Sequence, residues 1–298
     1  MKPDNLKKKE YKTLNMWKFG VMAIIVTMGI GAIELRAQTA SADSITVPLT
    51  DSSKTVFLNV DVPSGNIIVH GWARNDVFVQ SQMRIAPTDT LKPLKSKALR
   101  LYPDTSSFLW VREDTNVITV TAGAETSAHA FDITIDVPSE CSMELKTAKD
   151  GKIAVDSAIG DLEVTNTNGS VEMTDITGSA DVEAPNGDIT ATFLGVDSQK
   201  TMAFSSISGK IDVTLPQDVR AWVTMKTAQG SIYCDFDVQA ATMKPHMGRR
   251  GSRMRRGGAG MAPTRVKLRN SKEGTINGGG AEMTFTNFNG DIYLRKAH

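Results

Sequence analysis

The chain has 298 residues. Without the N-terminal segment described below, about 260 residues remain, which is enough for one large all-β domain or two ordinary domains. Its formal net charge is +1, but the charge is unevenly spread: 15 acidic and 7 basic side chains lie between residues 141 and 243, and 10 basic and no acidic ones between residues 244 and 272. The two cysteines, Cys141 and Cys234, form no CxxC motif, which argues against a redox or zinc role. Both share the alternation of hydrophobic neighbours, so we expect them to fill core volume, and a disulfide between them is the open alternative.

Residues 1–42 have the pattern of a secretory signal peptide. A lysine-rich start is followed by fifteen uncharged residues, 19–33, and then by small residues that allow cleavage after Ala37 or Ala42. Fifteen residues are fewer than the roughly 20 that cross a bilayer as a helix, although an uncleaved signal anchor is the alternative. Neither cysteine lies near this junction, so we expect no lipid anchor. The pattern predicts export to the periplasm or the cell surface.

A glycine recurs every nine residues in the middle of the chain. From residue 151 the segments are GKIAVDSAI, GDLEVTNTN, GSVEMTDIT, GSADVEAPN and GDITATFLG, with hydrophobic residues at the third and fifth positions of each. A period of two is typical of a strand with one buried face. The polar residues between them, such as Glu163 and Glu172, are expected to face water.

Two all-β architectures fit this spacing. Asn-Gly turns are typical of β-hairpins in a meander or sandwich, but here the turns alternate in kind every nine residues. Gly151, Gly169 and Gly187 form one series, and Gly160 and Gly178 the other, each series with a period of 18 residues. Isoleucine precedes the second series, as Ile159 and Ile176, and an inward-pointing isoleucine suits the corner of a coil better than a hairpin tip. We therefore predict a β-solenoid of stacked 18-residue coils, with glycines that adopt positive φ at the corners.

The glycine-strand pattern continues with looser spacing on both sides of this repeat. We expect residues 43–140 to be an N-terminal β region that caps the solenoid, because a stack of strands leaves unpaired edges at its ends. Residues 141–298 are expected to be the solenoid itself. An insertion rich in Arg, Gly and Met, residues 244–265, interrupts it.

Three stretches resemble the putative-adhesin family of β-strand-repeat proteins, a domain of unknown function in bacterial envelopes. They are SGNIIVHGW near the start, the run from KTAKDGKIAV to NGDIT, and GTINGGGAEMTFTNFNGDIYLR at the end. The resemblance covers about residues 45–298 and implies an extracytoplasmic β-solenoid. It implies no catalytic residue. The insertion departs from the family's plainer pattern.

The insertion concentrates positive charge and has too little hydrophobic surface to order itself. Such a segment is typical of a solvated loop. The alternative is an arm for an anionic partner, because arginine pairs bidentately with phosphate and carboxylate. In an envelope that partner is anionic lipid, lipopolysaccharide, an acidic glycan or an envelope protein, and no nucleic acid is expected. The arm's arginines are Arg249, Arg250, Arg253, Arg255 and Arg256.

No pattern in the sequence predicts a catalytic, metal or cofactor site. Each corner has a single glycine, unlike the paired glycines of calcium-binding nonapeptide repeats, and the four histidines have no metal-ligand spacing. Carbohydrate-active β-helices use paired carboxylates, and Glu163, Glu172, Asp181 and Glu183 could supply a pair. We therefore predict a non-enzymatic, adhesin-like interaction or scaffold protein without a cofactor. A carbohydrate lyase or hydrolase, and an envelope-stress accessory protein without its own ligand, are the alternatives.

Overall fold

A computed structural model describes residues 42–51, 54–85, 108–123, 129–240 and 270–297, which lie within one compact unit, Ala40–His298. The described residues form nineteen strands and no helix. The signal segment and the insertion 244–265 lie outside them. The strands are β1 Ala42–Pro48, β2 Val56–Ser64, β3 Ile67–Trp72, β4 Asp76–Ile85, β5 Phe108–Asp114, β6 Val117–Gly123, β7 His129–Pro138, β8 Cys141–Lys149, β9 Ile153–Asp156, β10 Ile159–Asn166, β11 Val171–Glu183, β12 Ile189–Val196, β13 Met202–Ser206, β14 Ile211–Leu215, β15 Ala221–Thr227, β16 Ile232–Cys234, β17 Asn270–Ile276, β18 Ala281–Asn287 and β19 Ile292–Lys296.

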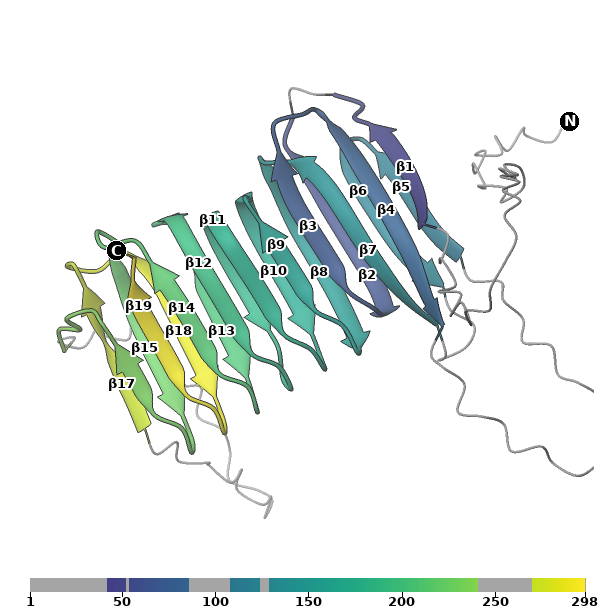
Figure 1. Cartoon of the computed structure of the whole chain (residues 1–298). Helices are drawn as coiled ribbons and strands as arrows, with labels where there is room; N and C mark the ends of the chain where they lie inside the picture. The colour runs from purple at the N-terminus through teal and green to yellow at the C-terminus, as the bar shows by residue number, and fades with distance from the viewer. Residues whose placement is uncertain (1–41, 52–53, 86–107, 124–128, 241–269, 298) are drawn as a thin grey trace, which may run out of the picture. The chain divides into compact units, whose positions relative to one another are not determined.

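The strands stack in two layers, which we call the first and the second sheet (Figure 1). The first runs in the order β5, β6, β2, β8, β10, the second half of β11, β13, β18, β15 and β17. The second runs in the order β1, β4, β7, β3, β9, the first half of β11, β12, β14, β19 and β16. One strand from each sheet makes a coil, and neighbouring coils pair in parallel. The all-β, solenoid-like prediction is thus confirmed against the hairpin alternative.

The chain order and the spatial order of the coils differ at both ends of the stack. The coil β18–β19 is inserted between β13–β14 and β15–β16, so that β13 and β15 both pair with β18. At the other end the coil β2–β3 is inserted between β6–β7 and β8–β9. Figure 1 shows both insertions, as yellow strands among green ones and purple strands among teal ones. Each end therefore holds its sequence-terminal coil between two others.

Antiparallel strands follow the last coils. β5 and β17 lie at the two ends of the first sheet, and β4 and β1 at one end of the second. The expected N-terminal cap region thus contributes two full coils, β2–β3 and β6–β7, as well as the antiparallel strands β1, β4 and β5. A strand that runs in the opposite direction ends the parallel repeat. The outermost edge then differs in hydrogen-bond pattern from the parallel edge that another coil would need.

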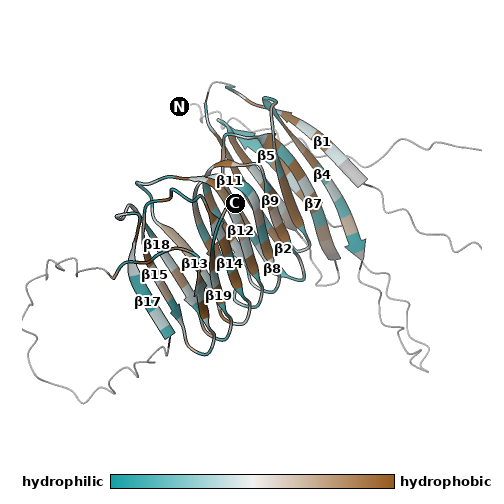
Figure 2. Ribbon diagram, turned by 60° about the vertical axis from the view of Figure 1, so that its left-hand side comes forward, coloured by the Kyte–Doolittle hydropathy of each residue, from teal (hydrophilic) through white to brown (hydrophobic). Residues whose placement is uncertain are grey.

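One hydrophobic core runs between the sheets. Hydrophobic and polar residues alternate along most strands (Figure 2), and the buried members of the alternation are mainly hydrophobic. Every coil contributes hydrophobic residues at the same positions, so like side chains stack on each other from coil to coil. Phe204 and Phe285 are an example, with parallel rings whose centroids lie 5.2 Å apart. Burial of these columns stabilises the stack, at roughly 1.5–3 kcal/mol for each large side chain.

The isoleucine prediction is wrong at one of the two corners. Ile176 is fully buried, whereas Ile159 is 47% exposed. The hydrogen-bond register explains the difference, because Ile159 pairs with Thr177. The equivalent of Ile176 one coil earlier is Ala158, which is also fully buried. The inward corner position is therefore occupied in both coils, and Ile159 lies one residue beyond it.

The proposed reason for the corner glycines is right for one series and wrong for the other. Gly160 and Gly178 have positive φ, 156° and 132°. Gly151, Gly169 and Gly187 do not. A Cβ on Gly169 would lie 1.6 Å from the carbonyl oxygen of Gly151, and a Cβ on Gly187 would lie 1.9 Å from that of Gly169. This second requirement is steric, because the backbone of one coil rests directly on that of the next.

A row of buried polar side chains accompanies these close contacts. The Asn166 side-chain amide donates to the Gly151 carbonyl at 2.9 Å, and the Asn287 amide donates to the Gly209 carbonyl at 2.7 Å. Buried carbonyls need such donors, because an unpaired one costs about 1–3 kcal/mol. Equivalent hydroxyl donors at the same corner are Thr147, Ser206 and Thr227.

Candidate interaction surfaces

The outer face of the first sheet is acidic near its middle. Glu144, Glu163 and Asp181 lie in register on β8, β10 and β11. Lys146 forms ion pairs with Glu144 and, at 3.8 Å, with Glu163. Exposed pairs of this kind contribute little to stability, so we regard this face as a solvated surface that is available for contact.

A second ion pair links this face to the loop that follows β12. Lys200 donates to both carboxylate oxygens of Asp161, at 2.7 and 2.6 Å, and the Ser179 hydroxyl donates to the same carboxylate at 2.6 Å. Lys200, and then Ser179, lower the pKa of Asp161, while the carboxylate raises the pKa of Lys200. The base that Ser179 faces is the Asp161 carboxylate, and the lowered pKa of Asp161 makes that carboxylate a weak proton acceptor.

Of the four carboxylates considered for carbohydrate hydrolysis, Glu163 and Glu172 do not come together. Glu163 lies on β10 in the first sheet, whereas Glu172 lies on the first half of β11 in the second sheet. The hydrophobic core separates the two sheets. Paired catalytic carboxylates must flank one glycosidic bond. The hypothesis is therefore wrong for Glu163 with Glu172. Asp181, by contrast, lies in register with Glu163 on the first sheet.

The second sheet carries an aromatic stack near β16. Tyr233 and Tyr293 lie in register on β16 and β19, with ring centroids 4.7 Å apart and an interplanar angle of 7°. The Arg295 guanidinium lies 5.1 Å from the Tyr293 centroid and donates to both carboxylate oxygens of Asp212, at 2.6 and 3.2 Å. Sequence reasoning missed this group, although GSIYC and GDIYL carry the two tyrosines at the same repeat position.

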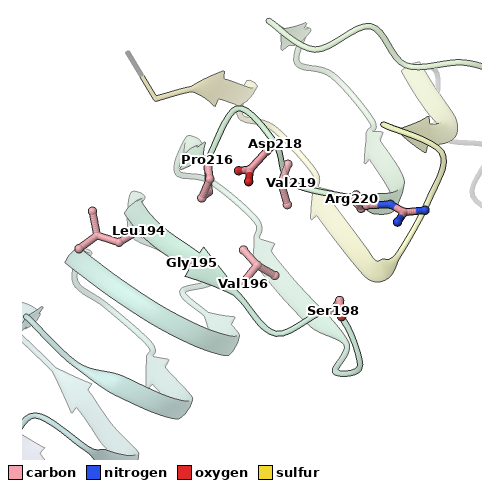
Figure 3. Close-up of a pocket in the computed structure, with 8 residues that line it drawn as sticks. All are labelled: Leu194, Gly195, Val196, Ser198, Pro216, Asp218, Val219 and Arg220. Carbon is pink, nitrogen blue, oxygen red and sulfur yellow. The ribbon is translucent and has the colours of Figure 1, made fainter.

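A hollow of about 330 Å³ opens at the corner where the chain passes from the second sheet to the first (Figure 3). The end of β12 forms one wall and the linker from β14 to β15 forms the other. Leu194, on β12, is 64% exposed. The lining residues are Leu194, Gly195, Val196, Ser198, Pro216, Asp218, Val219 and Arg220.

The cysteines are free and lie in different coils. Cys141, on β8, is fully buried, and burial raises the pKa of its thiol to about 12. Cys234, on β16, is partly buried, and its pKa is also raised, chiefly by burial. Of the two alternatives from the sequence, the structure supports core packing for Cys141 rather than a disulfide.

The remaining predictions concern the arginine arm, the signal segment, metal sites and membrane-spanning helices. The five arginines of the arm lie outside the described residues, as does the signal segment. Among the described residues, no three His, Cys, Asp or Glu side chains gather as a metal site would require. Within the same ranges, no helix has the length and hydrophobicity needed to span a membrane.

The Toastrack DUF4097 family model matches residues 10–277. A crystal structure from Clostridium sporogenes, titled "putative cell adhesion protein", aligns with a TM-score of 0.44 and 9% sequence identity. The alignment covers 87% of this chain and 100% of that one. No curated protein matches the sequence.

Proposed function

Because the chain belongs to the Toastrack DUF4097 family, we propose that it is an exported, non-enzymatic, adhesin-like interaction or scaffold protein of the cell envelope. The family is a domain of unknown function and not an enzyme family. The signal-peptide pattern of residues 1–42 supports export. N-terminal sequencing of the protein from its native host tests this point: a start after Ala37 or Ala42 supports it, and an intact Met1 in the membrane fraction indicates a signal anchor.

The observation that carries the proposal is that both sheets present regular rows of side chains on their outer faces. Hydrogen-bond register places equivalent residues of successive coils side by side, as in the row Glu144, Glu163 and Asp181. The core residues point the other way, so the outer rows are not needed to fill the interior. Repeat proteins commonly use such extended, regular surfaces for binding. Contact with another envelope component is the function that suits them best.

We assign the anionic-ligand contact to the arginine arm. Arginines paired with phosphate or carboxylate bind with a strong dependence on salt, because added ions screen exposed charges. The test uses vesicles with and without anionic lipid, lipopolysaccharide, and an acidic polysaccharide. Replacing Arg249, Arg250, Arg253, Arg255 and Arg256 by glutamine, or deleting residues 245–262, is expected to abolish the salt-dependent part of binding while the melting temperature stays the same.

The control variant replaces Lys226 and Lys272 by glutamine, which removes positive charge outside the arm. Equal losses in the control and the arm variants would overturn the assignment. If the protein binds none of the vesicles, lipopolysaccharide or acidic polysaccharide, the alternative of an accessory protein without its own ligand is favoured. A glycan-depolymerisation screen with Glu163→Gln and Glu172→Gln tests the enzymatic alternative, for which the structure offers no support from this pair.

A further inference from the structure

The hollow beside β12 lies where the repeat loses its regular period. Gly151, Gly169 and Gly187 are 18 residues apart, but Gly209 follows Gly187 by 22 residues and Gly230 follows Gly209 by 21. The extra residues lie in the linkers at one corner. The β9–β10 linker has two residues, 157–158, whereas the β12–β13 and β14–β15 linkers have five each, 197–201 and 216–220. Both longer linkers and the end of β12 line the hollow.

The end of β12 presents a strand edge to this hollow. On one side β12 pairs with β11 as far as Val196 and Gly178. On the other side its pairing with β14 ends at Thr192 and Thr214, so residues 193–196 have no strand partner there among the described residues. An unpaired edge offers backbone donors and acceptors in the spacing of another strand.

The side chains that line the hollow are mainly aliphatic, and its polar lining residues are Ser198, Asp218 and Arg220. Leu194, Val196, Pro216 and Val219 form the hydrophobic lining, and no aromatic ring is among the lining residues. Figure 3 shows the Asp218 carboxylate beside Pro216 and Val219, and the Arg220 side chain running away from them. The Asp218 side chain has no ion pair or hydrogen bond with any described residue.

We propose that this hollow binds an extended peptide segment of a partner protein. The peptide pairs with residues 193–196 of β12, places an aliphatic side chain against Leu194, and places a lysine or arginine beside Asp218. Backbone pairing supplies the register, and the two side chains, two residues apart on one face of the strand, supply the selectivity. The volume of about 330 Å³ suits one or two side chains rather than a whole folded domain.

This inference deepens the proposed interaction role and rests on it, but it uses a different site from the arginine arm. The probe is the fluorescein-labelled peptide acetyl-TVTKT-amide, titrated against the full chain by fluorescence anisotropy. Its relatives are TVTET, which reverses the charge, TSTKT, which removes the aliphatic side chain, and TVTKT with methylated backbone nitrogens. We expect TVTKT to bind about 10-fold tighter than TSTKT and about 5-fold tighter than TVTET. We also expect methylation to abolish binding.

Matched variants locate the site. Leu194→Ser is expected to weaken TVTKT binding about 10-fold, and Asp218→Asn to remove most of the preference over TVTET. The controls are Ile159→Ser, a second exposed residue at the same kind of corner, and Asp181→Asn on the first sheet. Equal effects of Leu194→Ser and Ile159→Ser would overturn the proposal, as would unsaturated binding of TVTKT at about 1 mM or undiminished binding of the methylated peptide.

The two proposals fail separately. If the protein does not bind the peptide but does bind anionic vesicles, only the proposal for the hollow is overturned. The reverse result would overturn the arm and leave the hollow as the contact site.

Discussion

The central coils and the coils at the two ends of the stack follow the same local pattern but differ in how they are assembled. From β8 to β12, each coil lies on the one that precedes it in the sequence, with a period of 18 residues. At the ends, β2–β3 and β18–β19 are each inserted between two coils that follow one another in the sequence, β6–β7 and β8–β9 at one end and β13–β14 and β15–β16 at the other. Since the close glycine contacts recur in both regions, the coil geometry does not depend on chain order. The order in which the coils stack is therefore not fixed by the geometry of the single coil.

The physical advantage of the inserted coils lies in the chain termini. A terminal coil at the end of a stack would pair on one side only and would fray. Insertion gives β19 partners on both sides, β14 and β16. This arrangement requires a longer connection between the coils. The entropic cost of closing such a loop grows only slowly with its length.

The sharpest test of the comparison is a pair of engineered disulfides. Ser205 and Thr286 lie in register on β13 and β18, and Thr286 and Lys226 on β18 and β15. Neighbouring strands are about 4.8 Å apart, within reach of a disulfide, whereas strands two places apart are beyond it. In a Cys234→Ser background, Ser205→Cys with Thr286→Cys is expected to cross-link fully, and Ser205→Cys with Lys226→Cys not at all. Cys141 remains in place, because its buried thiol has a pKa of about 12.

The readout is the shift in electrophoretic mobility under oxidising and reducing conditions. A stack in chain order would give the opposite result, since β13 and β15 would then be neighbours.

The next largest effect is expected from the glycine rows. Gly169→Ala places a methyl group 1.6 Å from the Gly151 carbonyl, so two coils must separate, and we expect a loss of about 3 kcal/mol or more in the free energy of unfolding. Gly290→Ala tests an inserted coil in the same way, because its Cβ would lie 2.0 Å from the Gly209 carbonyl. Denaturant unfolding measures both.

Gly195→Ala is the control, since its nearest neighbour would be a Thr177 methyl at 3.2 Å and its φ is not positive. A loss of about 1 kcal/mol or less is expected there. If Gly169→Ala behaved like Gly195→Ala, the close backbone contact would not be what requires glycine.

The smallest effect is expected at the ion pair that joins the regular coils to the lengthened corner. The pKa of Asp161 is lowered in the folded state by Lys200 and Ser179. A depressed carboxyl pKa adds stability above the unfolded value, near 4, and this stability is lost as the pH falls through the folded pKa. Asp161→Asn is therefore expected to lower the melting temperature by about 1–2 °C at pH 7, with the difference shrinking below pH 4.

Asp181→Asn is the control, because Asp181 lies in the same sheet and has no ion pair with any described residue. A pH-independent difference between Asp161→Asn and the parent protein would contradict the ion-pair explanation.

Several features of this protein could be predicted from the sequence because they are local. The alternation of Leu162 and Val164 with polar neighbours predicted strands with one buried face, and the 18-residue spacing of Gly151, Gly169 and Gly187 predicted coils. The same spacing relates Ala158 to Ile176 and could have corrected the expectation for Ile159. The aromatic pair was also accessible, through the shared position of Tyr233 and Tyr293 in their repeats.

The remaining features depend on which coils become neighbours, and a local period carries no such information. Every coil offers nearly the same parallel edge, so the sequence pattern alone determined an all-β stack with glycine corners and a hydrophobic interior. The separation of Glu163 and Glu172, nine residues apart, already follows from an 18-residue coil of two strands. Only the tertiary structure decided that β18 lies between β13 and β15 and that the longer linkers line a hollow at Leu194. The reason is that these outcomes are set by contacts between residues distant in sequence, which a local repeat pattern does not encode.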